Sequence, residues 1–327
     1  MARRRAATAL VGFAILVAPV VSIAQQPGLV LERTIDLGKV VGRIDHLAID
    51  PARKRLFVAE LGNGSGDAVD LETGRVFRRI GGLREPQGIG VAPDGTVAVA
   101  SAGDGSVRLF KADDLSPTAT VELGEDADNI RLDEAGRLVV GYGSGGLATL
   151  DPATGRKVAD IPLPAHPEGF QIDPKQDRIY VNLPTHHQVA VVERSSGKRI
   201  ANWGLWLAAG NFPMALDGSG GRLFAAYRWP GTIASIDTGS GDVIGKASVC
   251  GDADDIFYDT ARRRLYASCG GGSIAILDAR SGLAEASQIP TRKGARTSLF
   301  VPVLDRLFLA VPAAGELSAE IRVYAPR

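Results

Sequence analysis

The sequence has no surplus of positive charge, and beyond its N-terminal segment it has no long apolar run. The 37 basic residues equal the 37 acidic ones, so the chain lacks the basic surface that general nucleic-acid binding requires. No segment after residue 24 is long and apolar enough to span a bilayer as a helix. No Gly-x-Ser-x-Gly motif occurs, and neither of the 2 cysteines has the flanking pattern of a cysteine hydrolase. These absences leave a soluble domain without a recognisable nucleophile.

The first 24 residues are typical of a signal peptide. A basic start, MARRR, precedes the apolar stretch AATALVGFAILVAPVVSIA, and small residues offer a cleavage site before Gln25. Because no cysteine directly follows the apolar stretch, a lipoprotein anchor is excluded. An uncleaved N-terminal anchor is the alternative. We therefore predict a mature domain of residues 25–327, periplasmic or secreted, with 34 basic against 37 acidic residues. We expect a monomer that binds no nucleic acid and, after cleavage, no membrane.

A unit of about forty residues occurs seven times along the chain. Each unit opens with a short apolar stretch, and a second one follows four or five residues later, such as RLFVA at 55–59. The residues that close the first stretch lie 40 to 44 positions apart and are Asp50, Ala92, Asp133, Asp173, Asp217, Asp259 and Pro302. Apolar residues one and three positions before them alternate as in a strand. A third strand, a Gly-centred turn and a fourth strand complete the unit.

Four antiparallel strands per unit, repeated radially, predict an all-β, seven-bladed β-propeller. The seventh unit stops after its third strand, IRVYA at 321–325, and LVLERTIDL at 29–37 can supply the missing fourth strand. This pairing of the two ends would close the ring and remove exposed sheet edges. An open solenoid, the structural alternative, would need capping repeats, and the sequence shows none.

The repeated pattern, with Asp-Pro at 50–51, RLFVA at 55–59, DAVDL at 67–71 and TGR at 73–75, resembles that of YVTN-type propellers. Over roughly residues 28–325 the chain resembles the YncE-like seven-bladed proteins of the bacterial periplasm. The resemblance implies the fold and the compartment but no activity. The Gly-His and Trp-Asp signatures of WD repeats are absent. With 3 tryptophans, the chain also lacks the tryptophan-docking repeats of quinone-dependent dehydrogenase propellers.

Polar side chains recur four to five residues before the end of each first strand. Because the inner strands of a propeller begin at one rim of its central channel, we expect these side chains to converge there. The expected ring contains Asp45, His46, Gln87, Asp128, Asn129, Glu168, Asp254 and Asp255, and neighbouring loops add His166, Asn211, Arg228, Trp229 and Arg296. Converging carboxylates repel one another unless a cation, a proton or a basic side chain offsets their charge.

Three interpretations of this ring remain open. It could bind Ca²⁺ or Mg²⁺, which prefer oxygen ligands; this resembles regucalcin and gluconolactonase propellers, and the matching ligands would be Asn129, Glu168 and Asp254. It could instead hold an organic ligand, with basic loop residues balancing the acids and Trp229 stacking on the ligand or covering an apolar patch. Alternatively, the acids could accept backbone hydrogen bonds between blades and bind nothing.

We predict an exported binding protein that captures a small polar molecule or a periplasmic partner protein on the acidic rim. The sequence indicates no certain cofactor, and the metal interpretation calls for a divalent cation, Ca²⁺ or Mg²⁺. The alternative function is a metal-dependent, lactonase-like hydrolase, in which the cation polarises a carbonyl and a ring carboxylate activates water. Cys250 and Cys269 fall at the same end of one expected hairpin, so we expect a disulfide or a close pair, with two separate thiols as the alternative.

Overall fold

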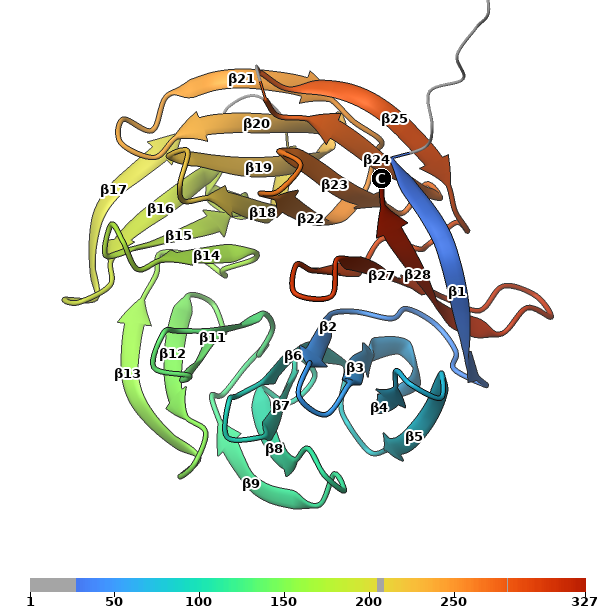
Figure 1. The fold of residues 1–327 in the computed structure, drawn as a ribbon. Coiled ribbons are helices and arrows are strands. Elements are labelled where there is room, and N and C mark those ends of the chain that lie inside the picture. Colours follow the sequence, from blue (N-terminus) through green and yellow to red (C-terminus); the bar gives the residue numbers. More distant parts are fainter. Residues whose placement is uncertain (1–27, 205–208, 281) are drawn as a thin grey trace, which may run out of the picture.

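The computed structural model describes residues 28–204, 209–280 and 282–327, so the expected signal peptide at 1–24 lies outside the described residues. In this part of the chain, 28 strands form seven separate four-stranded antiparallel sheets, arranged as blades around a centre (Figure 1). The prediction of an all-β, seven-bladed propeller with four strands per blade is confirmed. None of the described helices has the length and apolar character to cross a bilayer.

The blades follow one another along the chain. Blade 1 consists of β2 (Leu47–Asp50), β3 (Arg55–Glu60), β4 (Ser65–Asp70) and β5 (Arg75–Ile80), and blade 2 of β6 (Pro86–Val91), β7 (Thr96–Ser101), β8 (Ser106–Lys111) and β9 (Pro117–Glu122). Blade 3 consists of β10 (Ile130–Leu132), β11 (Leu138–Tyr142), β12 (Gly146–Asp151) and β13 (Arg156–Pro162), and blade 4 of β14 (Phe170–Asp173), β15 (Arg178–Leu183), β16 (Gln188–Glu193) and β17 (Lys198–Gly204). Blade 5 consists of β18 (Ala209–Asp217), β19 (Arg222–Trp229), β20 (Thr232–Asp237) and β21 (Val243–Ser248), and blade 6 of β22 (Ala253–Asp259), β23 (Arg264–Cys269), β24 (Ser273–Asp278) and β25 (Ala284–Pro290). Blade 7 consists of β26 (Ser298–Val301), β27 (Arg306–Val311), β28 (Ala319–Pro326) and β1 (Leu29–Gly38).

Blade 7 is assembled from both ends of the described chain. Strand β1 pairs antiparallel with β28, from Leu29 opposite Pro326 to Gly38 opposite Ala319. Figure 1 shows β1 beside β28, as the outermost strand of the blade that closes the ring. The predicted closure is therefore observed, and the edge of β28 is covered by hydrogen bonds instead of being open to pairing with another molecule.

The recurring aspartate at the end of the inner strand caps the turn that follows. Asp50 Oδ1 accepts a hydrogen bond from the Arg53 amide at 3.0 Å, and Asp217 Oδ1 accepts one from the Gly220 amide at 2.9 Å. These aspartates are almost fully buried, at 5% and 4% exposure. An Asp side chain that hydrogen-bonds the backbone two or three residues later stabilises such a turn. The repeated Asp is therefore a structural residue of the blade.

In several blades, the arginine at the start of the second strand ties the blade to the next one. Arg178 Nη1 donates to the carbonyl of Thr238 at 2.6 Å, which links blade 4 to blade 5. Arg222 Nη1 donates to the carbonyl of Ala279 at 2.7 Å and links blade 5 to blade 6 in the same way. A charge-assisted hydrogen bond of this kind contributes about 1.5–3 kcal/mol.

Apolar side chains from neighbouring blades form the core between them. One cluster joins Leu56 and Val58 of blade 1 to Phe308 and Ile321 of blade 7. All four side chains are at most 2% exposed. Because both faces of each blade pack against neighbours, the middle strands are apolar on both sides, and polar side chains are left for the rims and the channel.

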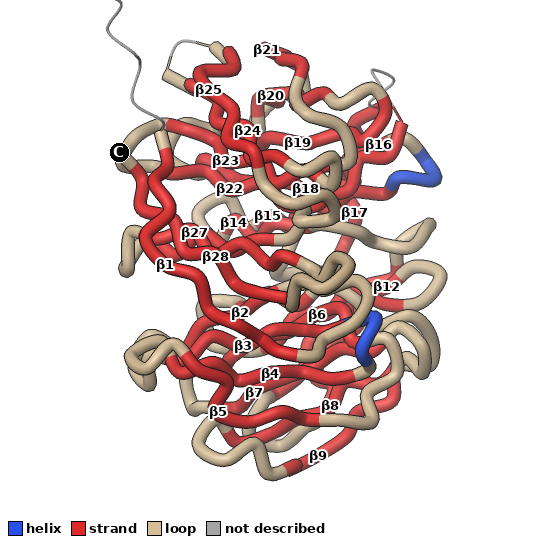
Figure 2. The backbone as a smooth tube through the Cα atoms, turned by 90° about the vertical axis from the view of Figure 1, so that its right-hand side faces the viewer, coloured by secondary structure: helices blue, strands red, loops and turns tan. Residues whose placement is uncertain are grey.

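The links between second and third strands lie on one rim of the propeller. Two of them form short 3₁₀ helices, η1 (Leu61–Asn63) in blade 1 and η2 (Pro184–His186) in blade 4. In Figure 2, which shows the molecule from the side, both helices lie on the same side of the disc. The inner strands begin at this rim as well, since the first and second strands of each blade are antiparallel neighbours.

Candidate functional site

The central channel holds a cavity of about 550 Å³ that receives side chains from all seven blades. The sequence-predicted residues that line it are Asp45, His46, Gln87, Asp128, Asn129, His166, Glu168, Arg228, Asp254 and Asp255. Other polar residues in its wall are Arg43, Asp126, Arg131, Gln171 and Ser298. A volume of this size is within the range of small-molecule sites. The tertiary structure therefore brings most of the expected ring to one place.

The starts of neighbouring inner strands touch one another around the channel. The Gly169 amide donates to the carbonyl of Phe212 in the next blade at 3.0 Å, and a Cβ atom on Gly169 would lie 2.6 Å from that oxygen. A Cβ atom on Gly88 would lie 2.0 Å from the carbonyl oxygen of Asp128. Glycine at these two positions lets the backbones approach, which holds the polar side chains in a tight circle.

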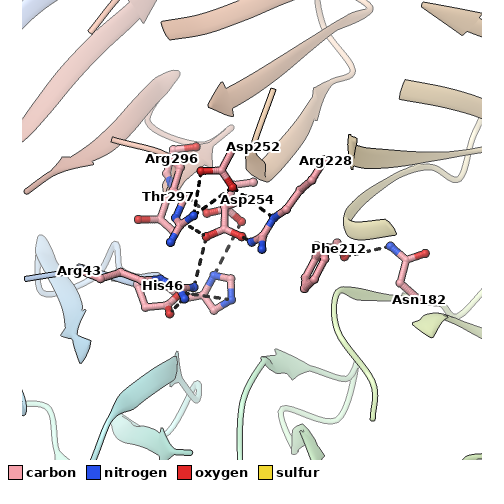
Figure 3. Close-up of polar contacts among 12 residues, drawn as sticks. Arg43, His46, Asn182, Phe212, Arg228, Asp252, Asp254, Arg296 and Thr297 are labelled. Atoms are coloured by element: carbon pink, nitrogen blue, oxygen red, sulfur yellow. Dashed lines mark hydrogen bonds and ion pairs between the residues drawn. The ribbon is translucent and has the colours of Figure 1, made fainter. Parts of the chain in front are cut away.

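On one side of the channel, three arginines surround the carboxylate of Asp254. Arg43 Nη2 lies 3.2 Å from Asp254 Oδ2, Arg296 Nε lies 3.1 Å from the same oxygen, and Arg228 Nη2 hydrogen-bonds Asp254 Oδ1. In Figure 3, Arg43, Arg228 and Arg296 approach Asp254 from separate segments of the chain. We call Arg43, Arg228, Asp252, Asp254 and Arg296 the arginine cluster.

Further contacts hold each guanidinium of the arginine cluster in position. Arg296 Nη1 donates to both carboxylate oxygens of Asp252, at 3.0 and 2.9 Å. The guanidinium carbon of Arg228 lies 3.8 Å from the centre of the Phe212 ring, a cation–π contact. Arg43 Nη2 also lies 2.8 Å from Asp45 Oδ2. The positive charges on this side of the channel are therefore largely balanced by fixed aspartates.

His46 lies deeper in the channel, between two buried aspartates. Its Nε2 is 3.9 Å from Asp45 Oδ1 and its Nδ1 is 3.7 Å from Asp255 Oδ1. Burial, followed by the nearby Arg131 and Arg43 cations, lowers the pKa of His46 to about 3, so the ring is neutral at ordinary pH. Burial raises the pKa of Asp45 and raises that of Asp255 to about 7. Asp255 Oδ2 also accepts a hydrogen bond from the Ser298 amide at 2.8 Å, which joins blades 6 and 7.

On the side of blades 3 and 4, four polar residues form what we call the acidic wall: Asp126, Asp128, Asn129 and Glu168. Asp128 and Asn129 are 5% and 4% exposed and immediately precede β10. Burial raises the pKa of Glu168 to about 7, and burial together with the Glu168 charge raises the pKa of Asp128 well above its ordinary value. Within the described residues, no lysine or arginine nitrogen lies within 4.0 Å of the Asp128 or Glu168 carboxyl oxygens.

His166 borders the acidic wall and is held by the backbone. Its Nδ1 lies 2.6 Å from the carbonyl oxygen of Gly143, so this nitrogen carries the proton, and it lies 3.5 Å from Asp126 Oδ2. In a neutral histidine held in this way, the other nitrogen, Nε2, is an acceptor.

Three of the expected site residues do not line the cavity. Asn211 is fully buried and donates to Asn182 Oδ1 at 3.0 Å and to the carbonyl of Gln188 at 3.1 Å, so it packs inside the blades. Trp229 is 59% exposed at the end of β19 and lies outside the cavity wall. Arg296 reaches the site only through the arginine cluster, because its charge is directed at Asp252 and Asp254.

Sequence reasoning missed several polar residues of the cavity wall, among them Arg43, Asp126, Arg131 and Gln171. Arg131 and Gln171 each stand within a short inner strand beside apolar residues. A charged or amide side chain at the central position of such a strand is a signal that could have identified them, since the innermost strand borders the channel. Arg43 and Asp126 each lie two residues before a predicted ring residue. They would have been included if more residues before each inner strand had been considered.

The two cysteines lie next to the arginine cluster. Cys250 and Cys269 are joined by a disulfide, with 5.9 Å between their Cα atoms. The bond connects the end of β23 to the segment that leads into β22, and the Gly270 amide donates to the carbonyl of Asp252 at 2.9 Å. The disulfide thus fastens the short segment that carries Asp252 and Asp254.

The donor set proposed for a divalent cation fits the structure only in part. Asn129 and Glu168 belong to the acidic wall, whereas both carboxylate oxygens of Asp254 are held by arginines. A cation beside Asp254 would therefore be repelled by three guanidinium groups. In the described residues, no three His, Cys, Asp or Glu side chains are grouped as metal ligands would be.

Comparisons with known proteins define the fold and leave the family open. No protein-family model matches the chain, and no curated protein matches it. Among solved structures, it is similar to a chain of Kuenenia stuttgartiensis hydrazine synthase, with 17% identity and a TM-score of 0.74, over 84% of this chain and 95% of that one. It is also similar to a chain of a mitotic checkpoint complex, with 12% identity and a TM-score of 0.77, over 97% and 98% of the two chains. At such low identity these likenesses support the propeller fold alone.

Fold and site together define a class: a seven-bladed β-propeller whose central channel contains a polar cavity with an arginine cluster on one side and an acidic wall on the other. Propellers of this architecture are consistent with the binding of ligands or proteins.

Proposed function

We propose that the protein is an exported, periplasmic binding protein that captures a small polar molecule in its central channel. The observation that supports this proposal most strongly is the cavity of about 550 Å³, into which all seven blades direct side chains. Six carboxyl groups and three guanidinium groups line it. Burying so many ionisable groups costs free energy unless they are paired, and a blade does not need them in order to fold.

A small molecule is favoured over a partner protein by where the polar groups lie. Asp45, Asp128 and Asp255 are at most 5% exposed, so a flat protein surface placed on the rim would not reach them. A small molecule inside the channel would reach them directly. Docking of a partner protein on the rim is therefore the competing outcome of the test.

The test uses a variant that fills the channel. Gln87→Trp places a large ring at the half-buried Gln87 position of the cavity wall and removes no buried charge. Thr118→Trp makes a matched change on the exposed face of the outer strand β9. The mature protein is incubated with a small-molecule extract of the source cells, then washed, denatured and analysed by mass spectrometry.

The wild-type protein and Thr118→Trp should both retain the same molecule, and Gln87→Trp should lose it. Equal retention by Gln87→Trp would place binding outside the channel. If the wild-type protein retains nothing, the binding proposal fails and a docking role is favoured.

The metal-dependent, lactonase-like hydrolase remains the alternative prediction. Its support is limited to the oxygen donors of Asn129 and Glu168, because the third expected donor, Asp254, is paired with arginines. Elemental analysis of protein purified without chelator, together with melting curves with and without EDTA, tests it. One bound cation per chain and a loss of stability with EDTA would favour the hydrolase.

A further inference from the structure

Hydrogen bonds between backbone groups hold the acidic wall in place. Its side chains are not used in these bonds and can therefore contact a ligand. The Asp128 amide donates to the carbonyl of Gly141 at 2.9 Å, and the Gly141 amide donates to the carbonyl of Asn129 at 3.0 Å. The Glu168 amide donates to the carbonyl of Asn182 at 3.1 Å. Three of the wall residues, Asp128, Asn129 and Glu168, are thus anchored to the second strand of their own blade. The carboxyl and amide groups are positioned without using their own oxygens, as a preorganised site requires.

Two of these oxygens are buried and have no hydrogen-bond partner among the described residues. They are Asp128 Oδ1 and Asn129 Oδ1, on side chains that are more than nine-tenths buried and line the cavity. A buried acceptor without a partner costs about 1–3 kcal/mol. Because both oxygens are acceptors, the ligand group that satisfies them must be a donor.

The two sides of the cavity differ in how their charges are balanced. Around Asp254, three guanidinium groups meet the carboxylates of Asp252, Asp254 and Asp45. The acidic wall has no comparable partner: within the described chain, the one ion-pair partner of its carboxyls within 4.0 Å is His166, at 3.5 Å from Asp126. The wall is therefore the part of the cavity that attracts positive charge.

The ionisation of the wall agrees with this. Burial is the main cause that raises the pKa of Glu168 to about 7, the Asp45 and Asp126 charges raise it further, and Arg228 and Arg43 oppose them. Asp128 shifts in the same direction through burial and the charges of Glu168, Asp45 and Asp126, again opposed by Arg43. Both shifts favour the protonated form of these carboxyls, whereas a bound cation favours the ionised form, so binding should release protons and should strengthen as the pH rises.

We propose that the captured molecule is a small organic cation, and that its primary ammonium group is held by Asp128, Asn129 and Glu168. An ammonium group has three N–H donors, which matches one acceptor oxygen from each of these side chains. Ca²⁺ takes six to eight oxygen ligands at close range, and among the described residues no three His, Cys, Asp or Glu side chains are grouped as metal ligands would be. This inference rests on the proposed function, since it names the class of molecule that enters the same channel.

The experiment compares matched four-carbon probes by isothermal titration calorimetry of the mature protein. The probes are n-butylammonium chloride, sodium butyrate and butan-1-ol, and calcium chloride is titrated separately. Butylammonium should bind, and the butyrate and butanol titrations should show no binding. Asp128→Asn and Glu168→Gln should each weaken butylammonium binding about tenfold or more, because each removes a charge-assisted hydrogen bond. Glu125→Gln, an exposed carboxyl on the same rim that does not line the cavity, should bind as the wild-type protein does.

Titration at near-neutral pH in two buffers with different ionisation enthalpies should show proton release on binding. A merely structural role of Asp128 and Glu168 would not produce it. Asp128→Asn replaces a buried carboxyl group with a neutral amide of nearly the same size, so we expect the variant to fold, and an unfolding curve verifies this.

Several results would overturn the inference while leaving the proposed function intact. One is tighter binding of butyrate than of butylammonium, which would make the arginine cluster the recognition site. Another is calcium binding that Asp128→Asn and Glu168→Gln abolish. A third is the failure of every probe while Gln87→Trp still abolishes retention of a cellular molecule. If no molecule is retained in the channel at all, both proposals fail together.

Discussion

Arg43 Nη2 lies 3.2 Å from Asp254 Oδ2, although 211 residues separate the two along the chain. The contact spans the junction where the ring closes, because Arg43 precedes blade 1 and Asp254 belongs to blade 6. It is one of three arginine contacts to a single carboxylate that is 9% exposed. The arginine cluster is thus built from segments that are brought together only when the propeller is closed.

Asp254→Asn is expected to destabilise the protein strongly. The substitution keeps the size of the side chain but leaves three arginines with too few carboxylates, and breaking a buried ion pair by removing one partner costs about 3–5 kcal/mol. The free energy of unfolding is measured by urea titration. Asp278→Asn is the matched control, because Asp278 pairs with Arg280, which is 65% exposed, and a surface pair contributes about 1 kcal/mol or less. Equal losses for the two variants would contradict the central role of Asp254.

The stability that Glu168 and Asp255 contribute should decrease as pH rises through the acidic and neutral range, whereas His46, whose pKa is lowered to about 3, contributes stability in the opposite direction. Burial raises the folded-state pKa of Glu168 from 4.5 to about 7 and that of Asp255 from 3.8 to about 7. A group that binds its proton more tightly in the folded protein contributes its full stability below its unfolded pKa and loses it as pH rises through the folded pKa. The contribution of these two carboxyls to the free energy of unfolding should therefore fall between about pH 4 and about pH 7 and level off above.

Glu168→Gln should flatten this pH dependence and raise the stability at about pH 8. At that pH the buried Glu168 carboxyl is ionised at a cost in folding free energy, whereas the glutamine amide stays neutral. Urea titrations at several pH values measure the slope. The exposed Glu125→Gln on the same rim should leave the curve unchanged. A Glu168→Gln curve parallel to that of the wild-type protein would show that Glu168 is ionised in the folded channel throughout.

Arg178→Met should lower the free energy of unfolding by about 1.5–3 kcal/mol, because it removes the charge-assisted bond to the carbonyl of Thr238 while keeping the apolar stem. Arg156→Met, on the exposed face of β13, should change it by less than about 0.5 kcal/mol. Thermal or urea unfolding compares the two. A similar effect at both positions would mean that the contact between blades 4 and 5 contributes no specific stability.

The joint replacement of Cys250→Ser and Cys269→Ser should cost about 3 kcal/mol, since the bond closes a loop between residues 19 positions apart. It should also weaken the retention of the channel ligand, because the bond fastens the segment that carries Asp252 and Asp254. Mass measurement of the wild-type protein without reductant should show two hydrogens fewer than the reduced chain. Two free thiols in that measurement would contradict the disulfide.

The blade pattern could be predicted from the sequence because it depends on local chemistry that recurs. Asp50 and Asp217 cap turns two to three residues ahead, and strand alternation is read within five residues. The closing strand was also predictable, since the last unit lacked one strand and an apolar segment preceded the first. Each of these signals is repeated or is required by the pairing of sheet edges.

The candidate site was predictable in position but not in charge balance. The residues before each inner strand do line the cavity, as Asp128 and Glu168 show. Trp229 and Asn211 do not line the cavity. The direction of a side chain at the end of a strand or in a link depends on local packing, which the spacing of residues along the sequence does not show. The expected acidic ring is in fact divided, since Arg43 and its neighbours balance one side of it.

The number of blades, the strands in each and the pairing of the two ends can be predicted from the residues alone, because periodic alternation and turn chemistry act over a few residues. Which charges neutralise one another depends on the folded arrangement. Closure of the ring places residues from distant blades within hydrogen-bond distance, so that Asp254 is surrounded by arginines while Asp128 keeps a free oxygen. Electrostatic energy depends on these distances in space, and the distances cannot be calculated from the number of residues between two charges.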